Sequence, residues 1–586
     1  MEHAEQRNAG TQEEPVSPAP ARNRGKLTRY TWSDLEPRYR ALVDLPLTEA
    51  TLTPFMEGWS ELSSVVEEIN ARLYVGTLTD TEDEEAHRLY RDFLDQILPE
   101  SMRAEQVLKE KLLSGGLAPP GMQEPLRRMR AEVALFRAEN VPLLVEEEKL
   151  CNEYHQILGE ETVQWESREI PVAQLQASYQ STDRSTRERS WRLAHERLLQ
   201  DKEALDDLWI RMLDLRQRIA ANAGLESYRA YRWRQLRRLD YCPEDMLAFH
   251  EAIHDIVVPA VAGRFRSRQD RLGVDALRPW DLYVDPSGGD PLQPFEHVDE
   301  LPERTAAIFR QIDPGLGEQF DVMRQEQLLD LDSRKNKAPG GFCIGFPISR
   351  RPFIFMNAVD VHRDVETLLH EGGHAFHFFA SDALPFHQQK QIPMEFAEVA
   401  SMSMEYLGAP YLDRDHGGFY TVADAARARV EHLDRTMLAW PRLAAIDAFQ
   451  HWAYLNPEQA RDPVACDERW ADLWRRYVPL VDWSGLDREL RAGWRNILHI
   501  FVVPFYIIEY CLAELGAVQV WRGALDSPAA AIGRYKQALA LGGTRDLRGL
   551  FAAAGAQFAF DAATLGDGVE LMLHTIASLE SQIYTS

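Results

Sequence analysis

Apolar side chains recur every three or four residues along most of the chain, which is the period of a helix with one buried face. The clearest case is the segment 203–223, which is followed by Gly224 as a stop signal. Its apolar stripe consists of Leu205, Leu208, Met212, Leu215 and Ile219. Similar spacing predicts helices over 56–74, 83–98 and 124–154, and helical patterns resume after residue 393. The sequence therefore predicts a mainly α fold.

One segment has a different pattern. Residues 336–357 contain two short β-prone runs, FCIGF and PFIFMN, which are separated by turn residues. This pattern predicts a hairpin, or a pair of antiparallel strands, within an otherwise helical chain. We therefore expect a small antiparallel β-sheet directly before the residues that carry the candidate chemistry.

Composition narrows the class of protein. Residues 1–27 are rich in Pro, Ala and charged side chains and have no periodicity, which predicts a disordered tail. The 586 residues carry a net charge of −27, and 45% of them are hydrophobic, enough for a large core. An acidic excess of this size repels phosphate and anionic lipid. We therefore expect no nucleic-acid partner and no membrane partner.

The cysteines and the termini favour a reduced, cytoplasmic protein. The five cysteines lie far apart in the chain, so their spacing supports neither a disulfide framework nor a CxxC zinc site. No apolar signal segment is visible at the N-terminus. The most apolar stretch, 497–508, is interrupted by His499 and Pro504 and is too short to cross a bilayer.

The stretch TLLHEGGHAFH, 367–377, is a candidate metal-binding helix. A helix is predicted from about 365 to 380, with Asp364 capping its start. His370 and His374 are four residues apart and share a face, the geometry two imidazoles need to bind one tetrahedral Zn²⁺. Glu371 lies about 100° around the helix, where its carboxylate can reach a metal-bound water.

A third ligand has to come from elsewhere. The HExxHxxGxxH pattern is excluded, because its glycine position is His377 and its last position is Ala380. The following segment 391–407 is a predicted helix with Pro393 in its first turn and with carboxylates on one apolar stripe. These carboxylates are Glu395, Glu398 and Glu405.

Three carboxylates are costly to bury unless cations, a metal or hydrogen-bond donors accompany them. We therefore predict Glu398 as the third ligand, with Glu405 or Glu395 orienting a ligand histidine. The alternative is a solvated acidic face. His377 is interpreted as a structural residue or as one that supports a ligand.

A hydrolytic site also needs donors for the oxyanion that forms when water attacks a carbonyl. The segment 494–516 carries His499, Tyr506 and Tyr510, and the two tyrosines are four residues apart, as on one helical face. They are candidate donors. The alternative is an aromatic core helix.

The two glycines in the motif also need an explanation. In an ordinary helix Gly372 and Gly373 would each cost roughly 1 kcal/mol relative to alanine. We expect them to let a neighbouring strand or the substrate approach the helix backbone. This predicts a tight contact over Gly373.

Four motifs together resemble one known family. They are GGFCIGFPISRRPFIFMN, HEGGHAFH, AEVAS and HIFVVPFYIIEY, in this order along the chain. They resemble the oligoendopeptidase F branch of the thimet oligopeptidase-like metallopeptidases. Weaker similarity lies in 222–253 and 539–558, so the resemblance covers most of the chain from about residue 200 onward.

The resemblance implies a two-lobed, helical, zincin-like fold with a long substrate channel and short unstructured peptides as substrates. It implies an N-terminal helical region over 28–195 and a catalytic region over 196–586. The implied ligands of one Zn²⁺ are His370, His374 and Glu398. Glu371 is the implied general base, and Tyr506, Tyr510 and His499 lie in the segment that supplies transition-state hydrogen bonds.

The resemblance also implies that the strand 351–357 pairs with substrate backbone by strand addition. The implied substrate-contacting positions of this region are Gly341, Phe353 and Phe355. No obligate protein partner is implied.

We therefore expect a zinc endopeptidase that cleaves oligopeptides. One alternative is a zinc carboxypeptidase or peptidyl-dipeptidase, which needs a cation to bind the substrate's terminal carboxylate, and Arg350 and Arg351 are candidates for it. A second alternative is a peptide-binding relative without activity. Cobalt or manganese could occupy the same ligand set as zinc.

Overall fold

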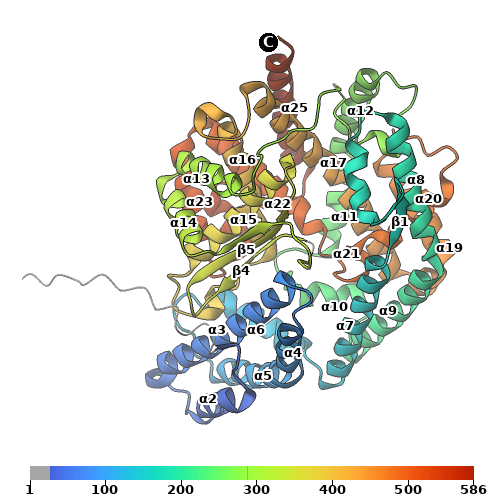
Figure 1. Cartoon of the computed structure of the whole chain (residues 1–586). Coiled ribbons are helices and arrows are strands. Elements are labelled where there is room, and N and C mark those ends of the chain that lie inside the picture. Colours follow the sequence, from blue (N-terminus) through green and yellow to red (C-terminus); the bar gives the residue numbers. More distant parts are fainter. Residues whose placement is uncertain (1–26, 287, 339, 586) are drawn as a thin grey trace, which may run out of the picture.

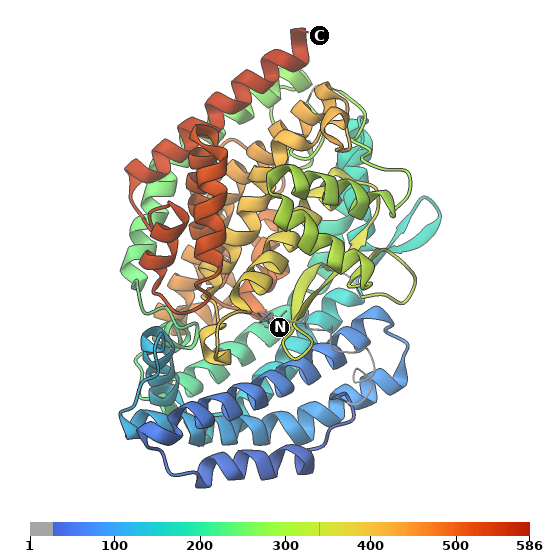
Figure 2. The same cartoon turned by 90° about the vertical axis from the view of Figure 1, so that its left-hand side faces the viewer.

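Two hydrophobic cores divide the protein into a small N-terminal lobe and a large lobe. The computed structural model describes residues 27–286, 288–338 and 340–585, so the predicted tail lies outside the described residues except for Leu27. One core is built almost entirely from residues 27–129, and the main core takes its side chains from Leu135 onward. In Figure 2 the helices of the first lobe form a layer beneath the rest of the molecule. The change from one core to the other thus lies between residues 129 and 135, whereas the sequence predicted a boundary between the N-terminal and catalytic regions at 195.

Helices make up most of both lobes, as predicted (Figure 1). Those of the small lobe are α2 (Trp32–Asp44), α3 (Glu49–Thr79), α4 (Glu84–Asp92), α5 (Leu98–Gly115) and α6 (Gln123–Leu135). Those of the large lobe up to the sheet are α7 (Val141–Gly159), α8 (Arg184–Gln200), α9 (Lys202–Asn222), α10 (Tyr228–Gln235), α11 (Pro243–Ala252), α12 (Val258–Leu272), α13 (Glu300–Ile312) and α14 (Pro314–Gln325). Those after the sheet are α15 (His362–Ser381), α16 (Met394–Gly408), α17 (Val422–Leu455), α18 (Pro457–Ala460), α19 (Pro463–Tyr477), α20 (Asp487–Ala492), α21 (Leu498–Phe501), α22 (Ile508–Asp526), α23 (Pro528–Leu539), α24 (Leu547–Ala554) and α25 (Ala562–Thr585).

The helix predicted over 203–223 is confirmed as α9. All five residues of its apolar stripe are buried, and Gly224 ends it with a φ of +70°. The single helix predicted over 124–154 is wrong, because the chain leaves the helical conformation at Phe136 and α7 begins five residues later. Pro142 stands in the first turn of α7, where its missing N–H is tolerated, whereas it would break a continuous helix.

A three-stranded sheet lies beside the candidate site. Its strands are β3 (Leu329–Asp332), β4 (Phe342–Phe346) and β5 (Arg351–Ala358), in the order β3–β5–β4. β4 and β5 form the predicted antiparallel pair, and β3 adds a parallel strand that the sequence did not predict. A second hairpin, β1 (Thr162–Trp165) with β2 (Arg168–Pro171), lies away from this sheet. The order leaves β4 as an edge strand.

Side-chain contacts hold α3 of the small lobe against the end of β4. The carboxylate of Glu68 accepts hydrogen bonds from the backbone N–H and the hydroxyl of Ser349, at 2.8 and 2.6 Å. Arg72 lies over the ring of Phe346, 4.1 Å from its centre. The small lobe therefore forms one wall of the space in front of β4.

Among the described residues one helical run, Pro243–Leu272, is long and apolar enough to cross a membrane by length and composition alone. Of its most apolar window, 44% is buried within the protein, and the run packs against α17 and α25. A single run of this kind, packed in a core, is weak evidence for a membrane span.

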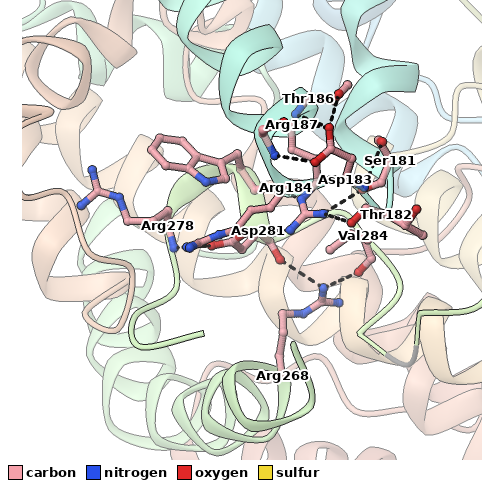
Figure 3. Close-up of polar contacts among 12 residues, drawn as sticks. Ser181, Thr182, Asp183, Arg184, Thr186, Arg187, Arg268, Arg278, Asp281 and Val284 are labelled. Carbon is pink, nitrogen blue, oxygen red and sulfur yellow. Dashed lines mark hydrogen bonds and ion pairs between the residues drawn. The ribbon is translucent and has the colours of Figure 1, made fainter. Parts of the chain in front are cut away.

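A buried carboxylate fixes α8 to the loop after α12. Figure 3 shows Asp281 between Arg184 and Arg187, and each guanidinium donates to its carboxylate, with closest distances of 2.7 and 3.0 Å. The backbone N–H of Arg278 donates to the same group at 2.9 Å. Asp281 is fully buried and Arg187 is 2% exposed, so the arrangement stabilises the fold only while both partners are present.

We expect Asp281→Ala to lower the free energy of unfolding by about 3 kcal/mol, because it leaves the buried guanidinium of Arg187 without a counter-charge. The measurement is a comparison of chemical denaturation curves. The matched control is Glu188→Ala on α8, which removes an exposed pair with Arg192 and should cost less than about 1 kcal/mol. Equal effects of the two substitutions would contradict the role of Asp281.

Candidate metal centre and substrate channel

The candidate site lines a cavity of about 900 Å³. Its walls come from α15 and α16, from the edge strand β4, from α17, from the segment that leads into α22, and from α3 of the small lobe. The cavity thus lies between the two lobes, and side chains from distant parts of the sequence face it.

The helix that carries the HEGGH motif is α15, which begins at His362, three residues before its predicted start. Asp364 accepts hydrogen bonds from the backbone N–H groups of Val359 and Val361, at 2.8 and 3.0 Å. This confirms its predicted place at the start of the helix, where a carboxylate also interacts favourably with the helix dipole.

Three candidate ligands converge at one end of the cavity. One ligand atom from each of His370, His374 and Glu398 lies within 4.8 Å of the other two. The Glu398 carboxylate is 3.3 Å from Nε2 of His370 and 3.7 Å from Nε2 of His374. Two imidazoles and one carboxylate, open to a cavity on their fourth side, are the donor set of a catalytic zinc site. The residues present therefore fit the metal that the sequence predicts.

The charges of this cluster are mutually dependent in the metal-free protein. Burial alone would lower the pKa of His370, but its contacts with Glu398 and Glu405 raise it well above its usual value. Burial raises and the two histidines lower the pKa of Glu398, and the net result is about 2. Burial lowers the pKa of His374 to about 4. A metal cation would replace the proton on His370, because a histidine ligand must be neutral.

The two helices of the cluster touch at a glycine. A Cβ on Gly373 would lie 2.5 Å from Cα of Ser401 and 2.6 Å from the carbonyl oxygen of Ala400, both backbone atoms of α16. The predicted tight contact is confirmed, but the predicted neighbour is wrong, since α16 approaches rather than a strand or substrate. Gly372 makes room for the ring of Phe309 instead.

Of the two carboxylates predicted to orient a ligand, only Glu405 is in contact with one. Its Oε1 is 2.8 Å from Nδ1 of His370, so it can hold the ring with Nε2 facing Glu398. Glu395 lies about 60° around the axis of α16 from Glu398, and it accepts a hydrogen bond from Tyr241 at 2.7 Å. The alternative that used Glu395 is therefore wrong.

Glu371 is buried, 6% exposed, and faces the cavity from beside the histidines. Burial raises its pKa to about 7 when no metal is bound, and the nearby backbone N–H of Cys343 on β4 offsets part of that shift. His377 lies one turn beyond His374, packed edge-on against Phe396, and burial lowers its pKa to about 3. The surroundings of His377 fit a structural role.

The tyrosines meet at the cavity, although not from one helical face. Tyr510 belongs to α22, whereas Tyr506 precedes it in an irregular segment, because Pro504 ends the preceding turn and Phe505 has a φ of +64°. Their ring centres are nevertheless 5.3 Å apart, and the Tyr506 hydroxyl donates to Glu398 at 3.2 Å. His499 stacks on Tyr506 with its centre 6.0 Å away, and it does not line the cavity.

The predicted substrate strand needs a correction. β5 is paired with β4 over residues 351–355 and with β3 at residues 354, 355 and 358, so it is the central strand and not the edge that strand addition needs. Phe353 stacks on Phe346, and Phe355 is fully buried against Phe342. The edge that faces the cavity belongs to β4, and Gly341, just before it, does line the cavity.

Several cavity residues were not found from the sequence. Cys343 was part of a quoted motif but received no role, and it lines the cavity beside Glu371. Glu514 lies four residues after Tyr510 and accepts a hydrogen bond from Tyr406. Glu67 comes from an ordinary amphipathic helix more than 300 residues before the motif, where no local pattern distinguishes it.

The arginines considered as binders of a substrate carboxylate are paired elsewhere. Arg350 is 2.5 Å from Asp382, and Arg351 is 2.9 Å from Glu326. Neither lines the cavity.

Known proteins resemble this chain in sequence and in fold. The model of peptidase family M3 matches residues 177–297 and 315–567. A curated oligoendopeptidase F homologue from Borreliella burgdorferi strain B31 is 22% identical over 295 residues, which cover 49% of this chain and 48% of the relative. The alignment thus spans about half the length of that curated relative.

Solved structures resemble the whole described fold. A protein described as an oligoendopeptidase F is 25% identical, with a TM-score of 0.85 over 94% of this chain and 97% of the other. PZ peptidase A in complex with an inhibitor gives the same identity and TM-score over 94% of this chain and 98% of its own.

We expect Gly373→Ala to destabilise the protein by about 3 kcal/mol, the upper end of the usual range for an overpacked core, because backbone atoms of α16 cannot yield as a side chain does. The control is Gly533→Ala on α23, where a Cβ meets nothing within 4 Å and the higher helix propensity of alanine should stabilise the protein by up to about 1 kcal/mol. Denaturation midpoints of the two variants measure the difference. An equally stable Gly373→Ala protein would show that the helices are not in close contact there.

Proposed function

This chain belongs to peptidase family M3, a family of metallopeptidases, and from that premise we propose that it is a zinc-dependent endopeptidase that hydrolyses short, unstructured oligopeptides. The observation that carries the proposal is the convergence of two histidines and a glutamate within 4.8 Å at the end of a cavity between two lobes. His370, His374 and Glu398 would hold the metal. When bound, zinc would supply Lewis acidity at the cavity face of these ligands.

Glu371 is proposed as the general base. Its carboxylate takes a proton from the attacking water and later delivers it to the leaving amine, so that one group serves both steps. Its position supports this role, since it lies next to the ligand His370 in the sequence and faces the cavity. The backbone N–H of Cys343 lies near the carboxylate from the side of the edge strand.

The tyrosines are proposed to act in different ways. Tyr506 already donates to Glu398, so its role is to orient a metal ligand. Tyr510 lies beside it on the cavity wall, and its hydroxyl is the proposed donor to the oxyanion of the tetrahedral intermediate. His499 packs behind Tyr506 and supports its position.

Peptide backbone is proposed to bind along β4. This strand is the free edge of the sheet, and its residues line the cavity next to Glu371. An extended peptide would add to it as a further strand through main-chain hydrogen bonds, which do not depend on sequence.

Internal rather than terminal cleavage is favoured by the charges of the cavity. A carboxypeptidase needs a cation that is free to bind the substrate's terminal carboxylate. Among the described residues, the three Arg and Lys side chains that line the cavity are each in contact with Glu366 or Asp382. A cytoplasmic location, and the absence of nucleic-acid, membrane and obligate protein partners, stay predictions of the sequence.

We expect Glu371→Gln to lower kcat at least about a hundredfold, because the amide cannot accept the proton, while zinc content stays at one per chain. Cleavage of an internally quenched peptide and elemental analysis of the same sample measure the two quantities. Glu398→Ala is the comparison, and it should lose both metal and activity. A Glu371→Gln protein that cleaves at the rate of the wild type would contradict the mechanism.

The two tyrosines should respond differently to replacement by phenylalanine. Tyr510→Phe should lower kcat about a hundredfold with little change in KM or in zinc affinity, because it removes a transition-state donor. Tyr506→Phe should weaken zinc affinity about tenfold, because it frees the Glu398 carboxylate. Zinc competition titrations and steady-state kinetics separate the two, and identical changes in both variants would contradict the assignment.

A further inference from the structure

We propose that Glu67, on the wall contributed by the small lobe, selects substrates that carry a basic residue about four positions from the cleaved bond. The inference rests on the proposed function and extends it from short peptides in general to cationic ones. It assigns a recognition role to a residue outside the metal centre.

The cavity is strongly acidic. Of the described residues that line it, seven are Asp or Glu and three are Arg or Lys. Three of the carboxylates, Glu371, Glu398 and Glu405, belong to the metal centre, and Glu514 is bonded to Tyr406. This leaves three carboxylates along the rest of the wall.

Two of these three are neutralised by neighbours. Asp382 is 3.0 Å from Lys390, and Glu366 is in contact with Arg435. Glu67 differs, because its one ion-pair contact among the described residues is with His387, at 3.3 Å, while Gln391 and Lys390 lie near enough to lower its pKa without forming such a pair. Burial lowers the pKa of His387 to about 4, so at neutral pH this ring brings no positive charge.

The Glu67 carboxylate is also accessible from the cavity. Its side chain is 42% exposed and lines the cavity, whereas that of the adjacent Glu68 is fully buried and bonded to Ser349 and Arg72. Glu68 thus attaches the lobes to each other, and Glu67, next to it, faces the substrate space. Burial raises the pKa of Glu67 to about 7, and a bound ammonium or guanidinium would stabilise its ionised form.

The position of Glu67 along the edge strand gives the distance to the cleaved bond. Glu371 and Cys343, near the start of β4, line the same part of the cavity, and the backbone N–H of Cys343 lies near enough to lower the pKa of Glu371. The adjacent Glu68 binds Ser349, three residues past the end of β4, so Glu67 lies toward that end of the strand. Four residues of strand span roughly 13 Å, so a peptide paired with β4 would present its fourth residue from the cleaved bond to Glu67.

The experiment is a lysine scan. A neutral, internally quenched peptide carries one lysine, or glutamine as its neutral counterpart, at each position on both sides of a mapped cleavage site. For the wild type, lysine at one position about four residues from the cleaved bond should raise kcat/KM roughly tenfold over glutamine. Glu67→Gln should abolish this preference, and Glu67→Lys should reverse it in favour of a glutamate at the same position.

The matched control is Glu61→Gln on the same helix, which removes an exposed pair with Arg38 outside the cavity and should leave the preference unchanged. A wild type that cleaves without a lysine preference would overturn the inference, as would a preference that survives in both Glu67 variants. If a zinc-loaded wild type cleaves none of the peptides, the proposed function fails and the inference fails with it.

Discussion

The site depends on how closely α15 and α16 approach each other at Gly373. The ligand histidines lie on one helix and the ligand glutamate on the other, and neither helix holds a complete donor set. Only a residue without a side chain lets the backbone of Ala400 and Ser401 lie directly against α15. This contact brings the Glu398 carboxylate within 4 Å of both histidines. Glycine at this position costs the helix about 1 kcal/mol relative to alanine, and in return it allows the short distance between Glu398 and the two histidines.

The close contact also buries two carboxylates beside His370, so the site needs a positive charge to balance them. Glu398 and Glu405 follow each other along α16 by two turns and face the same histidine, one from each ring nitrogen. Such carboxylates are costly to bury alone, and in the metal-free protein a proton on His370 balances them. A divalent cation would balance them better and would release that proton. The buried carboxylates thus favour binding of a metal, while the small lobe and β4 enclose the space in front of it.

Local patterns predicted those features that local interactions determine. The stripe of α9, the hairpin of β4 and β5 and the spacing of His370 and His374 each depend on residues within one or two turns or strands, and the structure has all three. The close contact over Gly373 was also predictable, since a glycine inside a helix is costly. Its partner was not, because any backbone could fill that space.

The features that the sequence did not predict depend on tertiary contacts. The sequence predicted β5 as the strand that binds substrate, because β3, whose acidic residues alternate with leucines, was not predicted to pair with its other edge. Tyr506 and Tyr510 have helical spacing, but α22 begins only at Ile508, so Tyr506 lies before the helix. Glu67 could not be predicted as a cavity residue, because it reaches the cavity only through the packing of the small lobe, which no local sequence pattern indicates.

The most direct test of the account is a crystal structure of the zinc-loaded protein, with diffraction data on both sides of the zinc absorption edge. The account predicts one anomalous peak per chain, bounded by Nε2 of His370, Nε2 of His374 and the carboxylate of Glu398. A zinc-loaded crystal with no peak between these three side chains, or with its one peak elsewhere, would contradict the central claim.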